Sequence, residues 1–164
     1  MSGDFFKRAR QFAALHAVEL GEELGAGTQG VVFTMIDKAG GDWTALKVHF
    51  HAHSFEREQA VYRQLAERNV LDVAGFAVPR LGRVDTALLA IEMSIVRPPY
   101  VLDFAGAALD EPPEFSDEIW GEWEREKRAQ FGARWPVVQR VIADFRAFGI
   151  HLLDVSPGNI AFRD

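Results

Sequence analysis

The sequence predicts an α+β fold in which a strand-rich first half is followed by a helix-rich second half. Residues 18–96 carry short runs of alternating apolar and polar side chains separated by turns, which is typical of antiparallel strands. Residues 117–148 instead carry apolar side chains at helical spacing. With 164 residues, 48% hydrophobic and 26% charged, the chain is expected to form one domain over residues 1–164. We expect a lobe over 1–96, a smaller helical lobe over 97–164, and a cleft between them.

The first half is expected to form five strands and two helices. Asp4 and Ser54 are expected to cap these helices, because their side-chain oxygens can accept hydrogen bonds from backbone N–H groups of the first turn. Alternation along the third strand places Lys47 and His49 on one face. In chain order, the expected elements are a helix over 5–16, strands over 18–20, 31–36 and 43–50, a helix over 55–68, and strands over 76–84 and 87–96.

The second half is expected to be mainly helical. Ser116 can cap a charged helix over 117–131. The pair Trp135-Pro136 places a proline in the first turn of another helix, where its missing N–H costs nothing. Gly149 is expected to end that helix. A loop and a short final strand are expected within 150–164.

Composition and charge exclude several classes of protein. Eighteen Lys and Arg against 24 Asp and Glu give a net charge of −6 with no basic block, which argues against a nucleic-acid partner. The chain has no cysteine, so disulfide scaffolds and thiolate metal sites are excluded. Residues 1–8 lack the apolar core of a signal peptide, and the longest apolar stretch, 87–96, is too short to span a bilayer. We therefore expect a cytoplasmic protein with no membrane partner.

A glycine-rich segment follows the first expected strand. Gly25, Gly27 and Gly30 are spaced G-x-G-x-x-G. Glycine lets backbone N–H groups come close to phosphate oxygens, so this spacing favours a phosphate-binding loop. The β-branched pair Val31-Val32 follows, which indicates a strand rather than the helix of a Rossmann unit. The alternative is an ordinary β-hairpin turn that happens to contain glycines.

Lys47 lies on an expected strand among apolar neighbours, shortly after the glycines. A largely buried lysine needs an anionic partner. Glu58 is a candidate, because it lies at the edge of the buried face of the following helix. The alternative is that both residues are ordinary surface charges.

Asp154 and Asn159 flank a Ser-Pro-Gly turn near the end of the sequence. A carboxylate and an amide oxygen held by one tight loop can serve as a general base and as a ligand for a hard cation, respectively. The alternative is an ordinary turn rich in Asp and Asn.

Taken together, these motifs resemble the protein kinase-like superfamily. The resemblance covers about residues 18–162 and rests on four motifs in the same order and at comparable spacing. They are G-x-G-x-x-G-x-V at 25–32, A-x-K at 45–47, a helical glutamate at 58, and D-x-x-x-x-N at 154–159. The resemblance implies a kinase-like fold, with a five-stranded antiparallel N-lobe sheet, a helix and a reduced helical C-lobe that carries a catalytic-type loop.

The resemblance implies that the cleft binds ATP. Val32 and Ala45 would cover the adenine, and backbone groups from Glu92 to Ser94 would face it. A glycine loop would lie over the phosphates; its residues are Gly25, Ala26, Gly27, Thr28 and Gly30.

It also implies the residues of the chemical step. Lys47 would contact the α- and β-phosphates and pair with Glu58. Asp154 would take the position of the catalytic base, and Asn159 would bind Mg²⁺.

The sequence departs from the kinase pattern at two places. Two leucines, in place of His-Arg, precede Asp154, and no D-F-G triplet follows Asn159. Asp164 lies only five residues after Asn159, too early to align with the D-F-G aspartate. Asp103 is a spare carboxylate in reach of a ribose or a metal; otherwise it belongs to a turn or caps a helix.

We therefore expect a kinase-type phosphotransferase that uses ATP and Mg²⁺ and moves the γ-phosphoryl group to a hydroxyl of a protein or small molecule. The alternative is a catalytically degenerate pseudokinase that binds nucleotide, a partner protein or a second copy of itself.

Two further patterns have either a packing or a binding interpretation. An aromatic stripe on the 117–131 helix is expected to pack on the second lobe rather than on a partner; it consists of Trp120, Trp123 and Phe131. Three alternating histidines near a strand end permit a metal site, but a loop that is either solvated or packed on the following helix is preferred; they are His49, His51 and His53.

Overall fold

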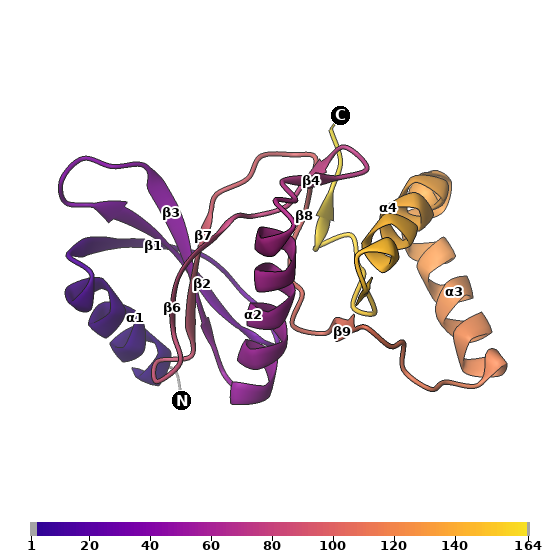
Figure 1. The fold of residues 1–164 in the computed structure, drawn as a ribbon, viewed down its shortest axis with the longest axis horizontal. Coiled ribbons are helices and arrows are strands. Elements are labelled where there is room, and N and C mark those ends of the chain that lie inside the picture. Colours follow the sequence, from indigo (N-terminus) through magenta and orange to yellow (C-terminus); the bar gives the residue numbers. More distant parts are fainter. Residues whose placement is uncertain (1–2, 164) are drawn as a thin grey trace.

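A five-stranded antiparallel sheet organises the first half of the molecule. The structure, a computed structural model, describes residues 3–163. The strand order is β1-β2-β3-β7-β6 (Figure 1). The strands are β1 (Val18–Ala26), β2 (Gly30–Asp37), β3 (Trp43–His49), β6 (Leu81–Asp85) and β7 (Ala90–Ser94). The α+β class and the five-stranded antiparallel sheet predicted from the sequence are confirmed.

Helices cover both faces of this sheet (Figure 1). α1 (Gly3–Leu15) contacts β1, β2, β3 and β7, whereas α2 (Ala52–Glu67) contacts β3, β6 and β7. Alternating side chains of β3 therefore enter two cores: Leu46 joins the cluster under α1 and Ala45 joins the cluster under α2. Consequently β3 is buried on both faces, which forces its charged side chains to find partners inside the protein.

The second half consists of two helices and several two-residue strands. α3 (Asp117–Phe131) and α4 (Trp135–Ala147) are joined by a short 3-10 turn, Gly132–Arg134. A four-stranded sheet has the order β11-β8-β5-β4, and β9 pairs with β10. These strands are β4 (Asp72–Val73), β5 (Phe76–Ala77), β8 (Tyr100–Val101), β9 (Ala108–Leu109), β10 (Ile150–His151) and β11 (Ile160–Ala161).

The pairing of β8 with β11 is important for the candidate site. It is antiparallel, with Val101 opposite Ile160. The backbone N–H of Leu102 then donates to the carbonyl of Asn159 at 2.8 Å. The residues that follow β8 are therefore held beside the loop that precedes β11.

Several predicted helix ends are correct. The Ser116 side chain accepts a hydrogen bond from the N–H of Ile119 and caps α3. Pro136 lies in the first turn of α4, and Gly149 follows that helix with a φ of +77°. At this φ, glycine avoids the steric cost that other residues pay.

Two predicted caps are wrong. Asp4 lies inside the first turn of α1, where its carboxylate pairs with Arg8 at 3.0 Å. α2 begins at Ala52, so Ser54 lies within the helix and its hydroxyl donates to the side chain of Gln29.

The predicted strand over 76–84 is interrupted. β5 and β6 belong to different sheets, and Pro79, which lacks an N–H donor, lies between them. The strand over 87–96 is shorter than predicted, Ala90–Ser94, and the first strand is longer, Val18–Ala26.

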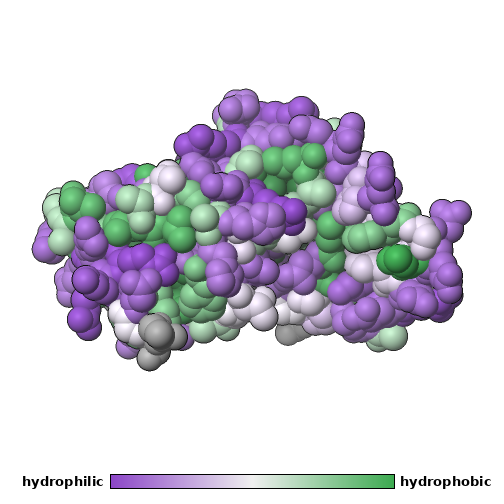
Figure 2. All heavy atoms as spheres, turned by 90° about the horizontal axis from the view of Figure 1, so that it is seen from below, coloured by the Kyte–Doolittle hydropathy of each residue, from purple (hydrophilic) through white to green (hydrophobic). Residues whose placement is uncertain are grey.

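No helix formed by residues 3–163 combines the length and apolar character needed to cross a bilayer. Seen from below, hydrophobic side chains form separate patches on a largely hydrophilic face (Figure 2). The larger exposed apolar side chains are spread over many elements; they include Leu15, Leu24, Trp43, Leu71, Ile95, Phe115, Ile119 and Val137.

Candidate nucleotide site

A cavity of about 480 Å³ lies where the five-stranded sheet meets the chain after β7 and the loop before β11. Its lining comes from the β1–β2 turn, β2, β3, α2, the 93–103 segment and Gly158-Asn159. The residues of the predicted site that line it are Gly25, Ala26, Gly27, Gly30, Val32, Ala45, Lys47, Glu58, Ser94 and Asn159.

The glycine segment forms the β1–β2 turn at the edge of this cavity. The N–H of Gly27 donates to the carbonyl of Gly30 at 3.0 Å, which closes the turn. A Cβ on Gly30 would approach the carbonyl oxygen of Val48 to 2.3 Å, so close packing of β2 on β3 requires glycine there. A Cβ on Gly25 or Gly27 would meet open space. Thr28, in contrast to the prediction, does not line the cavity.

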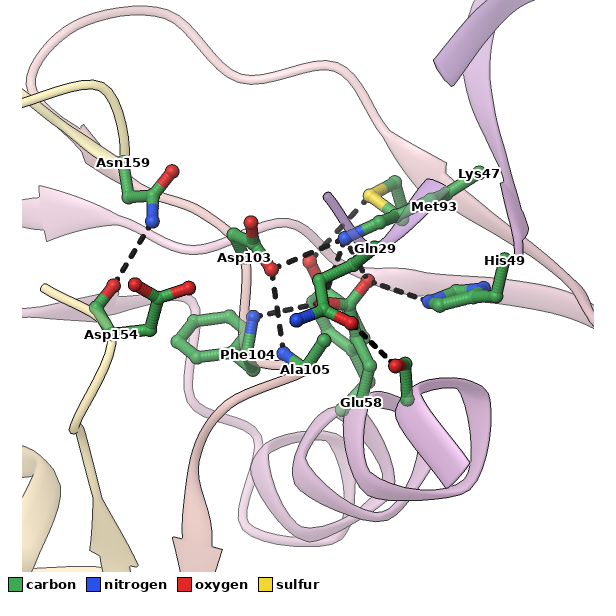
Figure 3. Close-up of polar contacts among 12 residues, drawn as sticks. Gln29, Lys47, His49, Glu58, Met93, Asp103, Phe104, Ala105, Asp154 and Asn159 are labelled. Atoms are coloured by element: carbon green, nitrogen blue, oxygen red, sulfur yellow. Dashed lines mark hydrogen bonds and ion pairs between the residues drawn. The ribbon is translucent and has the colours of Figure 1, made fainter. Parts of the chain in front are cut away.

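Lys47 lines the cavity, and its ammonium group contacts two carboxylates. Its Nζ is 2.9 Å from Oε1 of Glu58 and 3.2 Å from Oδ1 of Asp103 (Figure 3). Glu58 is fully buried and Lys47 is 7% exposed. Alternation on β3 directs Lys47 toward α2, and α2 supplies Glu58, so the sheet and the helix together hold the pair.

Burial and neighbouring charges shift the pKa values of Lys47 and Glu58 in opposite directions. Burial would raise the pKa of Glu58, but the Lys47 charge and the hydrogen bond from His49 outweigh it and lower that pKa to about 2. Burial would lower the pKa of Lys47, but the charges of Glu58 and Asp103 raise it above 10.5. Both residues are therefore charged at neutral pH.

The Glu58 carboxylate is fully occupied by donors. Oε1 contacts Lys47 Nζ and, at 3.2 Å, Nε2 of His49. Oε2 accepts from Lys47 at 3.1 Å and from the N–H of Phe104 at 2.8 Å. The ring of Phe104 packs between those of Tyr62 and Phe145, with centroids 5.3 and 5.5 Å away. Glu58 therefore ties β3 and α2 to the chain that follows β8.

Asp103, for which the sequence left a ribose or metal contact and a turn or cap as alternatives, lies at the cavity beside Lys47. It lies two residues after the end of β8 and has a φ of +67°. Apart from glycine, aspartate is one of the few residues that adopt this left-handed conformation. Its side chain contacts Lys47 and the N–H of Ala105, and it lines the cavity together with Asn159.

The loop that carries Asp154 and Asn159 is closed by its own hydrogen bonds. The side-chain amide of Asn159 donates to the carbonyl of Asp154 at 3.0 Å, and its backbone N–H donates to Ser156 at 2.9 Å. Asp154, Asn159 and Asp103 lie near one another (Figure 3). They also line a second, smaller cavity of about 10 Å³, which is roughly the room that one water molecule occupies.

Asp154 itself lines only the smaller cavity. A Cβ on Gly106 would approach the Cβ of Asp154 to 2.9 Å, so the chain after Asp103 passes directly behind Asp154. In the view of Figure 3, Asp103 is drawn between Asp154 and Lys47.

The Glu92 side chain does not line the cavity; the prediction for this segment concerned backbone groups from Glu92 to Ser94. Its carboxylate accepts from Arg83 at 2.8 Å and from Thr44 at 3.0 Å. Alternation along β7 sends Glu92 and Met93 to opposite faces, and Met93 and Ser94 form the cavity wall. Burial would raise the pKa of Glu92, but the hydrogen bonds from Arg83 and Thr44 lower it.

The three histidines do not form a metal site. His49 is completely buried, whereas His51 and His53 are exposed. Within residues 3–163, no group of three or more His, Asp or Glu side chains is arranged to hold a metal. The preferred prediction of a strand end that is solvated or packs on the following helix holds for His51, which is exposed, and for His49, which packs on α2, whereas His53 lies within α2 rather than in a loop.

The aromatic stripe on α3 packs on its own lobe, as predicted. Rings of Trp123 and Phe131 each lie 6.3 Å from the ring of Trp135 on α4. The indole N–H of Trp123 donates to the carbonyl of Leu153 at 3.1 Å, which connects α3 to the loop that carries Asp154.

Comparisons with known proteins show a distant structural similarity. No family model and no curated protein matches this sequence. The fold is similar to the crystal structure of a mutant of the Mycobacterium tuberculosis PknI kinase domain, with a TM-score of 0.41 and 19% identity. The similarity covers 80% of this chain and 48% of that one, so the chain spans about half of the length of the kinase domain.

Proposed function

We propose that this protein binds ATP with Mg²⁺ in the 480 Å³ cavity and transfers the γ-phosphoryl group to a hydroxyl acceptor. The observation that carries the proposal is the buried Lys47, held by Glu58 at 2.9 Å and facing a cavity rimmed by a glycine turn. A buried ammonium and a turn of small residues are suited to the charge and close approach of phosphate oxygens.

Asp103 and Asn159 are the residues that would hold Mg²⁺. Both supply oxygen ligands, which Mg²⁺ prefers, and the β8–β11 pairing keeps them together. The smaller cavity between them and Asp154 has room for a particle of about the size of one water. Mg²⁺ in this place would neutralise charge on the β- and γ-phosphates.

The other roles follow from position in the cavity. Lys47 would bind the phosphates. Val32 and Ala45 would contact the adenine ring. Asp154, which is exposed beside the smaller cavity, would orient the acceptor hydroxyl and take its proton.

Nucleotide affinity tests the metal assignment. We expect Asp103→Asn to weaken ATP binding in the presence of Mg²⁺ by about tenfold or more, because a carboxylate ligand is lost, and to have little effect in EDTA. Asp42→Asn, an exposed aspartate in the β2–β3 turn, is the matched control. Titration calorimetry measures both. An equal loss with and without Mg²⁺ would contradict the metal role of Asp103.

Phosphoryl transfer separates the enzyme from the second candidate, a domain that only binds nucleotide or a partner. That alternative is favoured by the two leucines before Asp154, where the kinase pattern has His-Arg. The assay is transfer from γ-labelled ATP to components of a cell lysate. Label transferred by the wild type and lost in Asp154→Asn supports the enzyme. Equal transfer by both proteins would refute catalysis through Asp154, and ATP binding without transfer would support the binding domain.

A further inference from the structure

His49 is a buried titratable residue that the proposed function does not use. It ends β3, two residues after Lys47, and its side chain is completely buried. Nε2 lies 3.2 Å from Oε1 of Glu58, and Nδ1 lies 3.2 Å from the carbonyl oxygen of Leu89. The edge of the ring packs on Phe55.

Both ring nitrogens of His49 therefore face atoms that can only accept hydrogen bonds. Glu58 is ionised at neutral pH, because its pKa is about 2, and a backbone carbonyl has no proton to donate. A neutral imidazole has one N–H, so one of these two contacts would join two acceptors. An imidazolium has two N–H donors and satisfies both.

The backbone keeps the ring in this position. The N–H of His49 donates to Leu89 at 2.9 Å, and its carbonyl accepts from Nη1 of Arg8 on α1 at 2.9 Å. Arg8 also donates to the carbonyl of Leu88. Leu89 has a φ of +52°, an uncommon conformation for a branched residue, and its carbonyl faces the ring. The contact with Glu58 is thus built by α1, β3 and the β6–β7 turn together.

The charge balance around the cavity also favours a protonated His49. The buried cluster of Lys47, Glu58 and Asp103 carries one positive and two negative charges. The charged groups that face His49 are Glu58 from α2 and Arg8 from α1, the latter at the backbone carbonyl only. A proton on His49 brings Lys47, His49, Glu58 and Asp103 to neutrality.

We propose that His49 is a positioning residue: as an imidazolium it holds Oε1 of Glu58, which in turn holds Lys47 toward the phosphates, so that nucleotide affinity depends on the proton carried by His49. The role in affinity rests on the proposed function, whereas the protonated state of His49 does not. A neutral His49 would offer Glu58 at most an uncharged N–H donor, which is a weaker partner for a carboxylate than an imidazolium and would loosen the hold of Glu58 on Lys47.

Nuclear magnetic resonance of the wild-type protein tests the protonated state directly. Long-range proton–nitrogen spectra distinguish an imidazolium, with two protonated nitrogens, from either neutral tautomer. We expect both ring nitrogens of His49 to carry a proton in the wild type at neutral pH, and only one of them in Glu58→Gln, where the carboxylate charge is absent. A single protonated nitrogen at neutral pH in the wild type would overturn the proposal.

Nucleotide affinity as a function of pH tests the positioning role. His49→Gln retains an amide donor but cannot carry the charge; His51→Gln, the same change at an exposed position, is the control. We expect His49→Gln to bind ATP about tenfold more weakly than the control at mildly acidic pH, a gap that closes as the pH rises. A gap that does not change with pH would show a merely structural role and overturn the positioning role.

The two proposals fail in different ways. If the wild type binds no nucleotide, the proposed function is wrong, and the His49 spectra in the wild type and Glu58→Gln decide the inference alone. If ATP binds but His49 is neutral, the inference is wrong and the proposed function stands.

Discussion

Acid stability is the most direct test of how the Lys47–Glu58 pair is built. The pKa of Glu58 falls from an ordinary value of 4.5 to about 2 in the folded protein, because the Lys47 charge and the His49 hydrogen bond outweigh burial. A difference of roughly 2.5 pKa units corresponds to about 3 kcal/mol of folding stability. Because the folded pKa is the lower one, this stability is present above pH 4.5 and is lost as the pH falls to about 2.

Glu58→Gln should remove this contribution and its pH dependence together. At neutral pH we expect the variant to be less stable by about 3 kcal/mol, since removal of one partner of a buried pair leaves the other uncompensated. Between pH 4.5 and about 2 the free energy of unfolding should fall steeply in the wild type and less steeply in the variant.

Urea unfolding followed by tryptophan fluorescence measures both quantities across this pH range. Glu56→Gln is the matched control, because Glu56 lies on the same helix and is exposed. The free energy of unfolding of the control should equal that of the wild type at every pH. Parallel loss of stability in the wild type and Glu58→Gln would show that Glu58 is not the group that titrates, and would refute the reasoning.

Two further predictions concern stability and need only thermal unfolding. Gly30→Ala should destabilise the protein by about 1–3 kcal/mol, because its Cβ would come within 2.3 Å of the Val48 carbonyl oxygen, whereas Gly27→Ala, whose Cβ meets open space, should change stability by less than about 0.5 kcal/mol. Equal effects of the two changes would contradict the close packing of β2 on β3. Ser116→Ala should cost about 1 kcal/mol through loss of the α3 cap, and an unchanged melting temperature would contradict that cap.

Local sequence patterns predicted most of the elements, and the exceptions have tertiary causes. Ser116 and Ser54 both precede apolar periodic segments, but only Ser116 is a cap. Ser54 instead binds Gln29, which comes from the β1–β2 turn, and α2 extends past it toward His51. A hydrogen-bond partner from a distant segment cannot be recognised in the local periodicity of the sequence.

The residues of the candidate site differ in how far they could be predicted. A lysine on a strand buried on both faces requires an anion, and Glu58 was the nearest carboxylate on a suitable helix face. Alternation also placed His49 on the same face as Lys47, so a signal for its contact with Glu58 was present in the sequence. The position of Asp103 depends on the pairing of β8 with β11, across more than fifty residues, and no local pattern encodes that register.

The two carboxylates that contact Lys47 are not equivalent. The Glu58 side chain is 1% exposed and accepts hydrogen bonds from three groups. Another anion therefore cannot replace Glu58 as the partner of Lys47 without disrupting these buried contacts. The Asp103 side chain is 27% exposed and lies 3.2 Å from Lys47 at the cavity wall. A phosphate that binds Lys47 would supply new acceptors and release the Asp103 carboxylate toward a cation beside Asn159. Under the proposed function, substitution of Asp103 would therefore affect the metal without removing the ammonium that binds phosphate, which substitution of Glu58 or Lys47 cannot do.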